Sequence, residues 1–177
     1  MEQSKEYHIN NSTIKIIFGN ILDSKAEVIV NSCGAGMSMS GGLTKMIREA
    51  GGEFIREDAK TKLPVTLGDA VVTTAGRLRQ KYIFHCITLD RSYDHSNTPE
   101  GISEDDIHQY IISHSIDKCF QLLQAMELTS IAFTAIGAGA AGIPFDKVSR
   151  VMSESDLWSY SLNWNKLNHK YSLYVRN

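Results

Sequence analysis

Residues 27–52 read EVIVNSCGAGMSMSGGLTKMIREAGG. The β-branched run Val28–Val30 is typical of a strand buried on both faces, and apolar residues recur at helical spacing from Leu43 to Ala50. The glycines between strand and helix are Gly34, Gly36, Gly41 and Gly42. A glycine-rich turn that opens onto a helix gathers backbone N–H groups and the positive end of the helix dipole. The stretch therefore predicts an anion-binding loop, with a merely tight connection as the alternative.

A second stretch of the same kind covers residues 131–144 and reads IAFTAIGAGAAGIP. Its glycines follow an apolar strand, and Pro144 suits the start of a helix because its missing N–H would have no intrahelical partner there. In a mostly parallel sheet, both loops leave the carboxyl ends of strands, where such folds bind ligands. Together the two loops predict that a ligand with two adjacent phosphates is held between them.

The rest of the chain alternates between strand and helix patterns. β-Branched or apolar runs predict strands, and apolar residues at helical spacing predict helices. The expected strands cover residues 13–18, 28–30, 68–74, 81–88, 131–136 and 170–175. The expected helices cover residues 43–50, 53–62 and 146–164, with the longest one starting at Ser103 and ending near Met126. Residues 90–101 contain almost nothing apolar and predict a surface loop.

Length and charge limit the classes of protein to which the chain can belong. The 177 residues are enough to bury a core without disulfides or metals, so we expect a single domain over residues 1–177. A net charge of −2 argues against a nucleic acid polymer as partner, because that requires a basic face. The start has no apolar leader, and no run reaches membrane-spanning length. We expect a soluble, cytoplasmic monomer without a membrane partner.

The cysteines and histidines give no sign of a metal or redox centre. Cys33, Cys86 and Cys119 are odd in number and lack Cys-x-x-Cys spacing, so buried free thiols are expected. His85 interrupts an apolar run and is expected to be a hydrogen-bonded core histidine. The other candidate pair, at positions 108 and 114, does not share a helix face. The sequence therefore predicts no metal and no cofactor.

Two common nucleotide-binding motifs do not account for the glycine-rich loops. Residues 137–142 satisfy G-x-G-x-x-G, but only about thirty-five residues follow, too few for the further strands and helices of a dinucleotide-binding fold. A P-loop is excluded because Leu43 and Thr44 separate Gly42 from Lys45. Neither motif therefore accounts for the two loops.

Seven short motifs follow one another along the chain. They are GNI at 19–21, VIVN at 28–31, GG at 41–42, AGG at 50–52, GDAVVT at 68–73, KYIFH at 81–85 and SIAFTAIGAGAAGIP at 130–144. In this order they resemble the motifs of the macrodomains that bind ADP-ribose. The resemblance implies a three-layer α/β/α fold, with a central mixed sheet of six or seven strands and with ADP-ribose in a cleft at the strand ends.

The resemblance also assigns ligand contacts residue by residue. It implies that Asn20 and Ile21 contact adenine, and that Asn31 lies beside the distal ribose. The first diphosphate loop would consist of Gly41, Gly42 and Leu43, and the second of Gly137, Ala138, Gly139, Ala140, Ala141 and Gly142. Asn20 replaces the family's usual aspartate and can accept only through an uncharged amide oxygen, so adenine selectivity is expected to be softer. Tyr174 is either an adenine neighbour or a core aromatic.

Three positions depart from the branch of the family that hydrolyses ADP-ribose links. Gly34 replaces the second asparagine of Asn-Ala-Ala-Asn, Thr44 replaces an aspartate, and Ala141 replaces an aromatic residue. Hydrolysis needs a positioned acid–base group or water, so no catalytic residue is assigned. The first hypothesis is a module that binds free or protein-linked mono-ADP-ribose. The alternatives are an ADP-ribosyl hydrolase that holds its water by other means, and a sensor of another ADP-ribose-like nucleotide.

Overall fold

The computed structural model describes residues 4–9, 11–92, 102–154 and 170–175. Its strands are β1 (Ser4–Ile9), β2 (Ser12–Phe18), β3 (Val28–Gly34), β4 (Ala70–Thr74), β5 (Tyr82–Leu89), β6 (Ser130–Phe133) and β7 (Lys170–Val175). They form one sheet in the order β1-β2-β7-β6-β3-β5-β4. The five inner strands are parallel, whereas β1 and β4 pair antiparallel with their neighbours. The expected mixed sheet of six or seven strands is confirmed.

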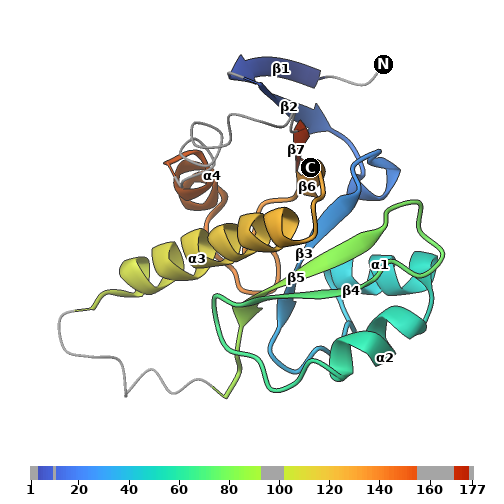
Figure 1. Ribbon diagram of the computed structural model, residues 1–177. Coiled ribbons are helices and arrows are strands. Elements are labelled where there is room, and N and C mark those ends of the chain that lie inside the picture. The colour runs from blue at the N-terminus through green and yellow to red at the C-terminus, as the bar shows by residue number, and fades with distance from the viewer. Residues whose placement is uncertain (1–3, 10, 93–101, 155–169, 176–177) are drawn as a thin grey trace.

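Helices cover both faces of this sheet (Figure 1). They are the short 3₁₀ helix η1 (Ile21–Asp23), α1 (Gly42–Gly51), α2 (Phe54–Lys60), α3 (Glu104–Ala125) and α4 (Phe145–Glu154). Apolar side chains of α3 and α4 share a core with one face of the sheet, and those of α1 and α2 share a second core with the other. The three-layer α/β/α fold predicted from the sequence is therefore confirmed.

The central strand β3 shows why its sequence is continuously apolar. Val28 and Val30 pack in the core beneath α3 and α4, whereas Ile29 packs in the core beneath α1 and α2. Successive side chains of a strand point to opposite faces, so a strand covered on both faces has no solvent-exposed set. β3 continues through Gly34, and the first glycine-rich loop follows it.

The longest predicted helix and the cysteines are as expected. Ser103 caps α3: its side chain accepts the Asp106 N–H, and the Asp106 carboxylate accepts the Ser103 N–H, which forms a capping box. The three cysteines are free and buried.

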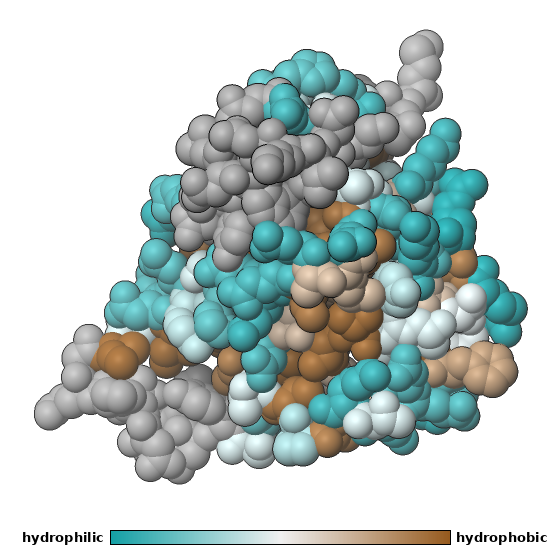
Figure 2. Space-filling view, in the orientation of Figure 1, coloured by the Kyte–Doolittle hydropathy of each residue, from teal (hydrophilic) through white to brown (hydrophobic). Residues whose placement is uncertain are grey.

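Figure 2 shows hydrophilic residues over most of the described part of the face that α3 crosses, with hydrophobic residues between them. No helix in the described part of the chain is both long and apolar enough to span a membrane.

The structure differs from the sequence prediction mainly at the ends of elements: for example, β6 ends at Phe133 rather than at residue 136, and α2 covers 54–60 rather than 53–62. β1 was not predicted, because its sequence SKEYHI is polar and it forms an exposed edge that only pairing with β2 defines. The strand predicted from Gly68 begins at Ala70, because Gly68 adopts a left-handed turn conformation. β3 extends through Gly34, into what was predicted as loop. Residues 155–164 of the predicted last helix lie outside the described residues.

Candidate nucleotide-binding cleft

A cleft of about 1540 Å³ runs along the carboxyl ends of the parallel strands. Gly19–Ile21 and Tyr174 line it at the ends of β2 and β7, and Thr88–Ser92 line it at the end of β5. The two glycine-rich loops, which follow β6 and β3, line its middle. Because neighbouring strands lie about 4.8 Å apart, the strand order places these groups in sequence along one line. The cleft exceeds the ~300–1,000 Å³ of pockets for drug-sized ligands and suits a long ligand.

The structure brings most of the predicted contact residues to this cleft. Those that line it are Asn20, Ile21, Gly41, Gly42, Leu43, Ala138, Gly139 and Ala140. Those that do not line it are Asn31, Gly137, Ala141 and Gly142. Tyr174 was considered either as a residue of the ligand site or as a core aromatic. It lines the cleft and is also buried in the core that includes α1 and α2.

Asn31 lies in the sheet rather than in the cleft. Its side chain is fully buried, and its Nδ2 lies 2.9 Å from Nδ1 of His85, the residue opposite it on β5. Nε2 of His85 lies 2.8 Å from the Thr73 hydroxyl oxygen. Burial lowers the pKa of His85 to about 4, although the Asp58 carboxylate opposes this. His85 is thus a neutral core histidine, as predicted, and it holds Asn31 away from the cleft.

The first glycine loop, residues 35–41, is anchored by two of its own side chains. Met37 and Met39 are buried although their neighbours are glycine and serine, and both have left-handed backbone conformations, with φ of +48° and +49°. Such φ values are uncommon for residues other than glycine. Met37 packs in a small core with Cys33, and Met39 packs in the core beneath α1 and α2. Side-chain burial therefore holds this loop against the domain.

Helix α1 begins where the first glycine loop ends. Gly41 is its N-cap and has no side chain that could cap the helix. The N–H groups of Gly42, Leu43 and Thr44 precede the first backbone bond of the helix, from the Lys45 N–H to the Gly41 carbonyl. A Cβ placed on Gly41 or Gly42 would meet nothing within 4 Å. The first turn therefore presents N–H donors to open space in the cleft.

The second glycine loop, residues 137–142, has no side chain larger than a methyl group. Gly137 has a left-handed φ of +83°, and a Cβ there would lie 2.6 Å from Cδ1 of Ile143. The Ile143 N–H donates to the Gly137 carbonyl, and the Gly142 N–H donates to the Gly139 carbonyl. The loop is thus a compact turn whose ends are fixed by backbone bonds.

Three consecutive N–H groups of this turn remain without a partner. The N–H groups of Gly137, Ala138, Gly142 and Ile143 all donate within the protein. Among the described residues, nothing accepts from the N–H groups at 139–141. Gly139 and Ala140 are exposed and Ala141 is half-buried, so these N–H groups are open to a ligand, and successive N–H groups in a turn form anion-binding concavities. This turn has the donors that an anionic ligand requires.

Few charged groups surround these donors. Among the described residues, Asp90 and Arg91 are the charged side chains that line the cleft, and both lie at the end of β5. Hydrogen bonds from the Ser92 hydroxyl and N–H hold the pKa of Asp90 below its ordinary value. No three His, Cys, Asp or Glu side chains in the described ranges gather to hold a metal ion. The middle of the cleft is therefore neutral and donor-rich.

Cys33 lines the cleft but is not poised to react. Its thiol donates to the Met37 sulfur at 3.5 Å. Burial raises its pKa well above the ordinary value. The thiolate is the nucleophilic form of cysteine, so this thiol is structural.

The three departures from the hydrolytic pattern occupy different environments. Gly34 lines the cleft, where a Cβ would lie 3.3 Å from the Leu89 carbonyl oxygen, so a larger side chain would be crowded. Thr44 also lines it, but its hydroxyl donates to the Gly41 carbonyl at 2.7 Å. Ala141 lies outside the lining. None of the three side chains supplies an acid or base.

Sequence reasoning missed two polar residues of the cleft floor, Ser32 and Thr88. Their hydroxyl oxygens lie 2.7 Å apart, and Ser32 Oγ also accepts the Gly137 N–H at 3.2 Å. The alternation of side chains along β3 was the available signal, because a buried Asn31 places Ser32 on the opposite face. This alternation could be used only with the knowledge that His85 lies opposite Asn31.

An α/β/α fold with a donor-lined cleft at the carboxyl ends of its parallel strands defines a class of nucleotide-binding domain. The sequence pattern of the Macro domain family matches residues 30–152. The chain belongs to this family.

Three relatives are similar to this chain over most of its length. A protein of Sulfolobus acidocaldarius is 32% identical over 140 residues, which cover 77% of this chain and 70% of the relative. A protein of Aquifex aeolicus is 31% identical over 144 residues, 80% of this chain and 79% of the relative. A macro domain-containing protein of Caldanaerobacter subterraneus is 29% identical over 143 residues, 78% of this chain and 75% of the relative.

Solved macrodomain structures share the fold. A mutant macrodomain of Oceanobacillus iheyensis, solved with ADPR, superposes with a TM-score of 0.79 at 18% identity, covering 97% of this chain and 89% of the other. The Trypanosoma brucei macrodomain in complex with ADP-ribose gives 0.74 at 17% identity, covering 91% of this chain and 63% of the other.

Proposed function

We propose that this protein binds ADP-ribose, free or attached to a protein, through its two glycine loops. The observation that carries the proposal is the presence of two sets of unpartnered N–H donors in one neutral cleft, at 42–44 and at 139–141. Backbone amides at a helix start and in a compact turn suit a diphosphate. Membership of the Macro domain family supports this ligand, as do the ADP-ribose complexes of the Oceanobacillus and Trypanosoma macrodomains.

The order of the strand ends suggests the direction in which the ligand lies. Adenine would occupy the end lined by Gly19–Ile21 and Tyr174, with the diphosphate between the loops and the distal ribose toward Thr88–Ser92. The Asn20 oxygen already accepts the Leu22 N–H at 3.2 Å. An adenine amino group would have to share that oxygen, which supports the softer adenine selectivity expected from the sequence.

Calorimetric titration of the native protein with ADP-ribose, NAD, ADP and AMP tests the proposal. We expect micromolar affinity for ADP-ribose, about 8 kcal/mol at the standard state, and much weaker binding of AMP. If AMP bound as tightly as ADP-ribose, adenine alone would supply the affinity and the two loops would have no role in it. A clear preference for another nucleotide would favour the sensor alternative.

The hydrolase alternative has one candidate residue. Asp90 is the carboxylate that lines the described part of the cleft, and it lies at the end assigned to the distal ribose. A positioned acid or base typically contributes 10²–10⁴-fold, yet Asp90 is bonded to Ser92. We therefore expect release of label from a protein carrying carboxylate-linked ADP-ribose to be far slower than with an active hydrolase. Fast release that Asp90→Asn removes would identify the protein as an enzyme.

A further inference from the structure

The second glycine loop has little side-chain packing of its own. Residues 137–142 carry only hydrogen or methyl side chains, and only Ala138 and Ala141 pack against the core. Two polar side chains act near its ends: one contacts the start of the loop, and the other, five residues after its end, contacts α3. They belong to β3 and α4, which are distant from each other in the sequence.

Ser32 holds the start of the loop. Its Oγ accepts the Gly137 N–H at 3.2 Å and is in turn bonded to the Thr88 hydroxyl at 2.7 Å. Thr88 is buried, so this bond has little competition from water. The contact joins the loop after β6 to β3 and β5, the next two strands of the sheet. It also turns the Gly137 N–H toward the protein, so the unpartnered donors begin further along the loop.

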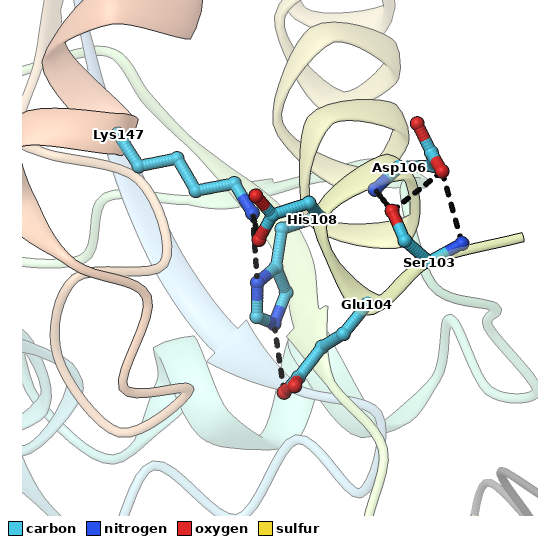
Figure 3. Close-up of polar contacts among 6 residues, drawn as sticks. Ser103, Glu104, Asp106, His108 and Lys147 are labelled. Carbon is cyan, nitrogen blue, oxygen red and sulfur yellow. Dashed lines mark hydrogen bonds and ion pairs between the residues drawn. The ribbon is translucent and has the colours of Figure 1, made fainter.

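Lys147 holds the segment just after the loop. It lies in the first turn of α4, and its side chain reaches across to the first turn of α3 (Figure 3). Its Nζ donates to the Asp105 carboxylate and lies 3.4 Å from Nδ1 of His108. The other ring nitrogen of His108 lies 3.8 Å from the Glu104 carboxylate.

The burial of Lys147 indicates that this contact is specific. Only 8% of the residue is exposed, and lysine is rarely so buried unless it is paired. A cation in the first turn of a helix is also disfavoured by the helix dipole. The acidic start of α3, which includes Glu104 and Asp105, offsets both effects and so fixes the start of α4 against α3.

We propose that Ser32 and Lys147 are positioning residues: Ser32 holds the first residue of the second glycine loop, Lys147 fixes the start of the helix that follows it, and together they orient the loop N–H groups toward the diphosphate. This inference rests on the proposed binding of ADP-ribose. Lys147 does not line the cleft and acts through α4. Ser32 lines the cleft, but its hydroxyl acts through Gly137.

Lys147→Met tests the far contact, with Lys147→Arg as the conservative variant and Lys15→Met as the matched control. Lys15 pairs with Glu6 at the outer edge of the sheet, so its loss changes the net charge equally. We expect Lys147→Met to weaken ADP-ribose about tenfold, while adenosine, which has no phosphate, keeps its affinity. Lys147→Arg should restore most of the loss, and Lys15→Met should have no effect.

Ser32→Ala tests the near contact, and Ser32→Thr retains the hydroxyl. Ser32→Ala should again weaken ADP-ribose and spare adenosine, with amide chemical shifts of the unliganded protein changing mainly at residues 137–142. This pair carries the test if Lys147→Met fails to fold.

Equal losses for ADP-ribose and adenosine, or no loss in either folded variant, would overturn the positioning proposal. Native ADP-ribose binding would still stand in that case. If the native protein bound no ADP-ribose, the proposed function itself would fall.

Discussion

The two glycine loops of the cleft are held in different ways. The first, residues 35–41, is anchored by the buried side chains of Met37 and Met39 in left-handed conformations. The second, residues 137–142, has no anchoring side chain and is fixed by backbone bonds and by Ser32. Large buried side chains therefore hold the first loop, whereas the second depends mainly on hydrogen bonds, with Ala138 and Ala141 as its small packing contacts.

Because of this difference, we expect mutations in the first loop to change mainly the stability of the domain, and mutations in the second loop to change mainly its affinity for the ligand. Removing a buried methionine leaves a cavity in a core, so damage to the first loop should reduce the stability of the whole domain. The second loop contributes little buried side-chain volume, so changes there should reduce ligand binding while the fold persists. The first two predictions below each test one side of this contrast, the third perturbs the sheet away from both loops, and they run from the largest expected effect to the smallest.

Gly139→Glu should reduce ADP-ribose affinity by about 1000-fold, ~4 kcal/mol. A Cβ at this position meets nothing within 4 Å, and no left-handed φ is required, so the fold should survive. The added carboxylate would enter the space proposed for the phosphates and repel them. Calorimetry measures the loss, circular dichroism checks the fold, and Gly139→Ala is the control that adds only a methyl group. A folded Gly139→Glu variant with native affinity would place the diphosphate elsewhere.

Met37→Ala should lower the free energy of unfolding by about 3 kcal/mol, because a fully buried side chain is lost. Urea denaturation measures this change. Ala140→Gly is the matched truncation in the second loop, and it should cost less than about 1 kcal/mol. If the two variants lost equal stability, the contrast between a packed loop and a hydrogen-bonded loop would be wrong.

Glu27 lies at the amino ends of β3 and β6, which is the end of the sheet opposite the cleft, and it can be changed without touching either loop. Its carboxylate bonds the Lys81 ammonium and the Thr129 N–H and hydroxyl. Burial alone would raise the pKa of Glu27, but these bonds lower this pKa from 4.5 to about 2.

The protonation of Glu27 should therefore make stability depend on pH. Because the carboxyl group binds a proton more tightly in the unfolded chain, its contribution is complete above about pH 4.5 and is lost as the pH falls toward 2. After allowance for solvent screening, we expect Glu27→Gln to cost about 1–2 kcal/mol at pH 7. Urea titrations from pH 7 to pH 2 measure it, and ADP-ribose affinity at pH 7 should not change. An unchanged pH profile in Glu27→Gln would show that other carboxylates carry the dependence.

Local sequence patterns predicted the sheet, both loops and the cap at Ser103, because β-branched runs, glycine clusters and capping boxes act over short distances. They did not predict that the Asn31 side chain is buried and bonded to His85, because His85 belongs to a different strand. Met37 and Met39 were not expected to be buried either, since a glycine- and serine-rich loop gives no periodic pattern. Pairings between distant segments decide these positions.

The central claim is that the start of α1, just after the first glycine loop, and the second glycine loop bind the same diphosphate through backbone N–H groups. Amide chemical shifts followed by ¹⁵N NMR during a titration with ADP-ribose test it most directly. The account predicts that the amides of residues 42–44 and 139–141 shift together, with the same saturation curve, and that adenosine moves neither set. Shifts confined to one loop, or equal shifts with adenosine, would contradict it.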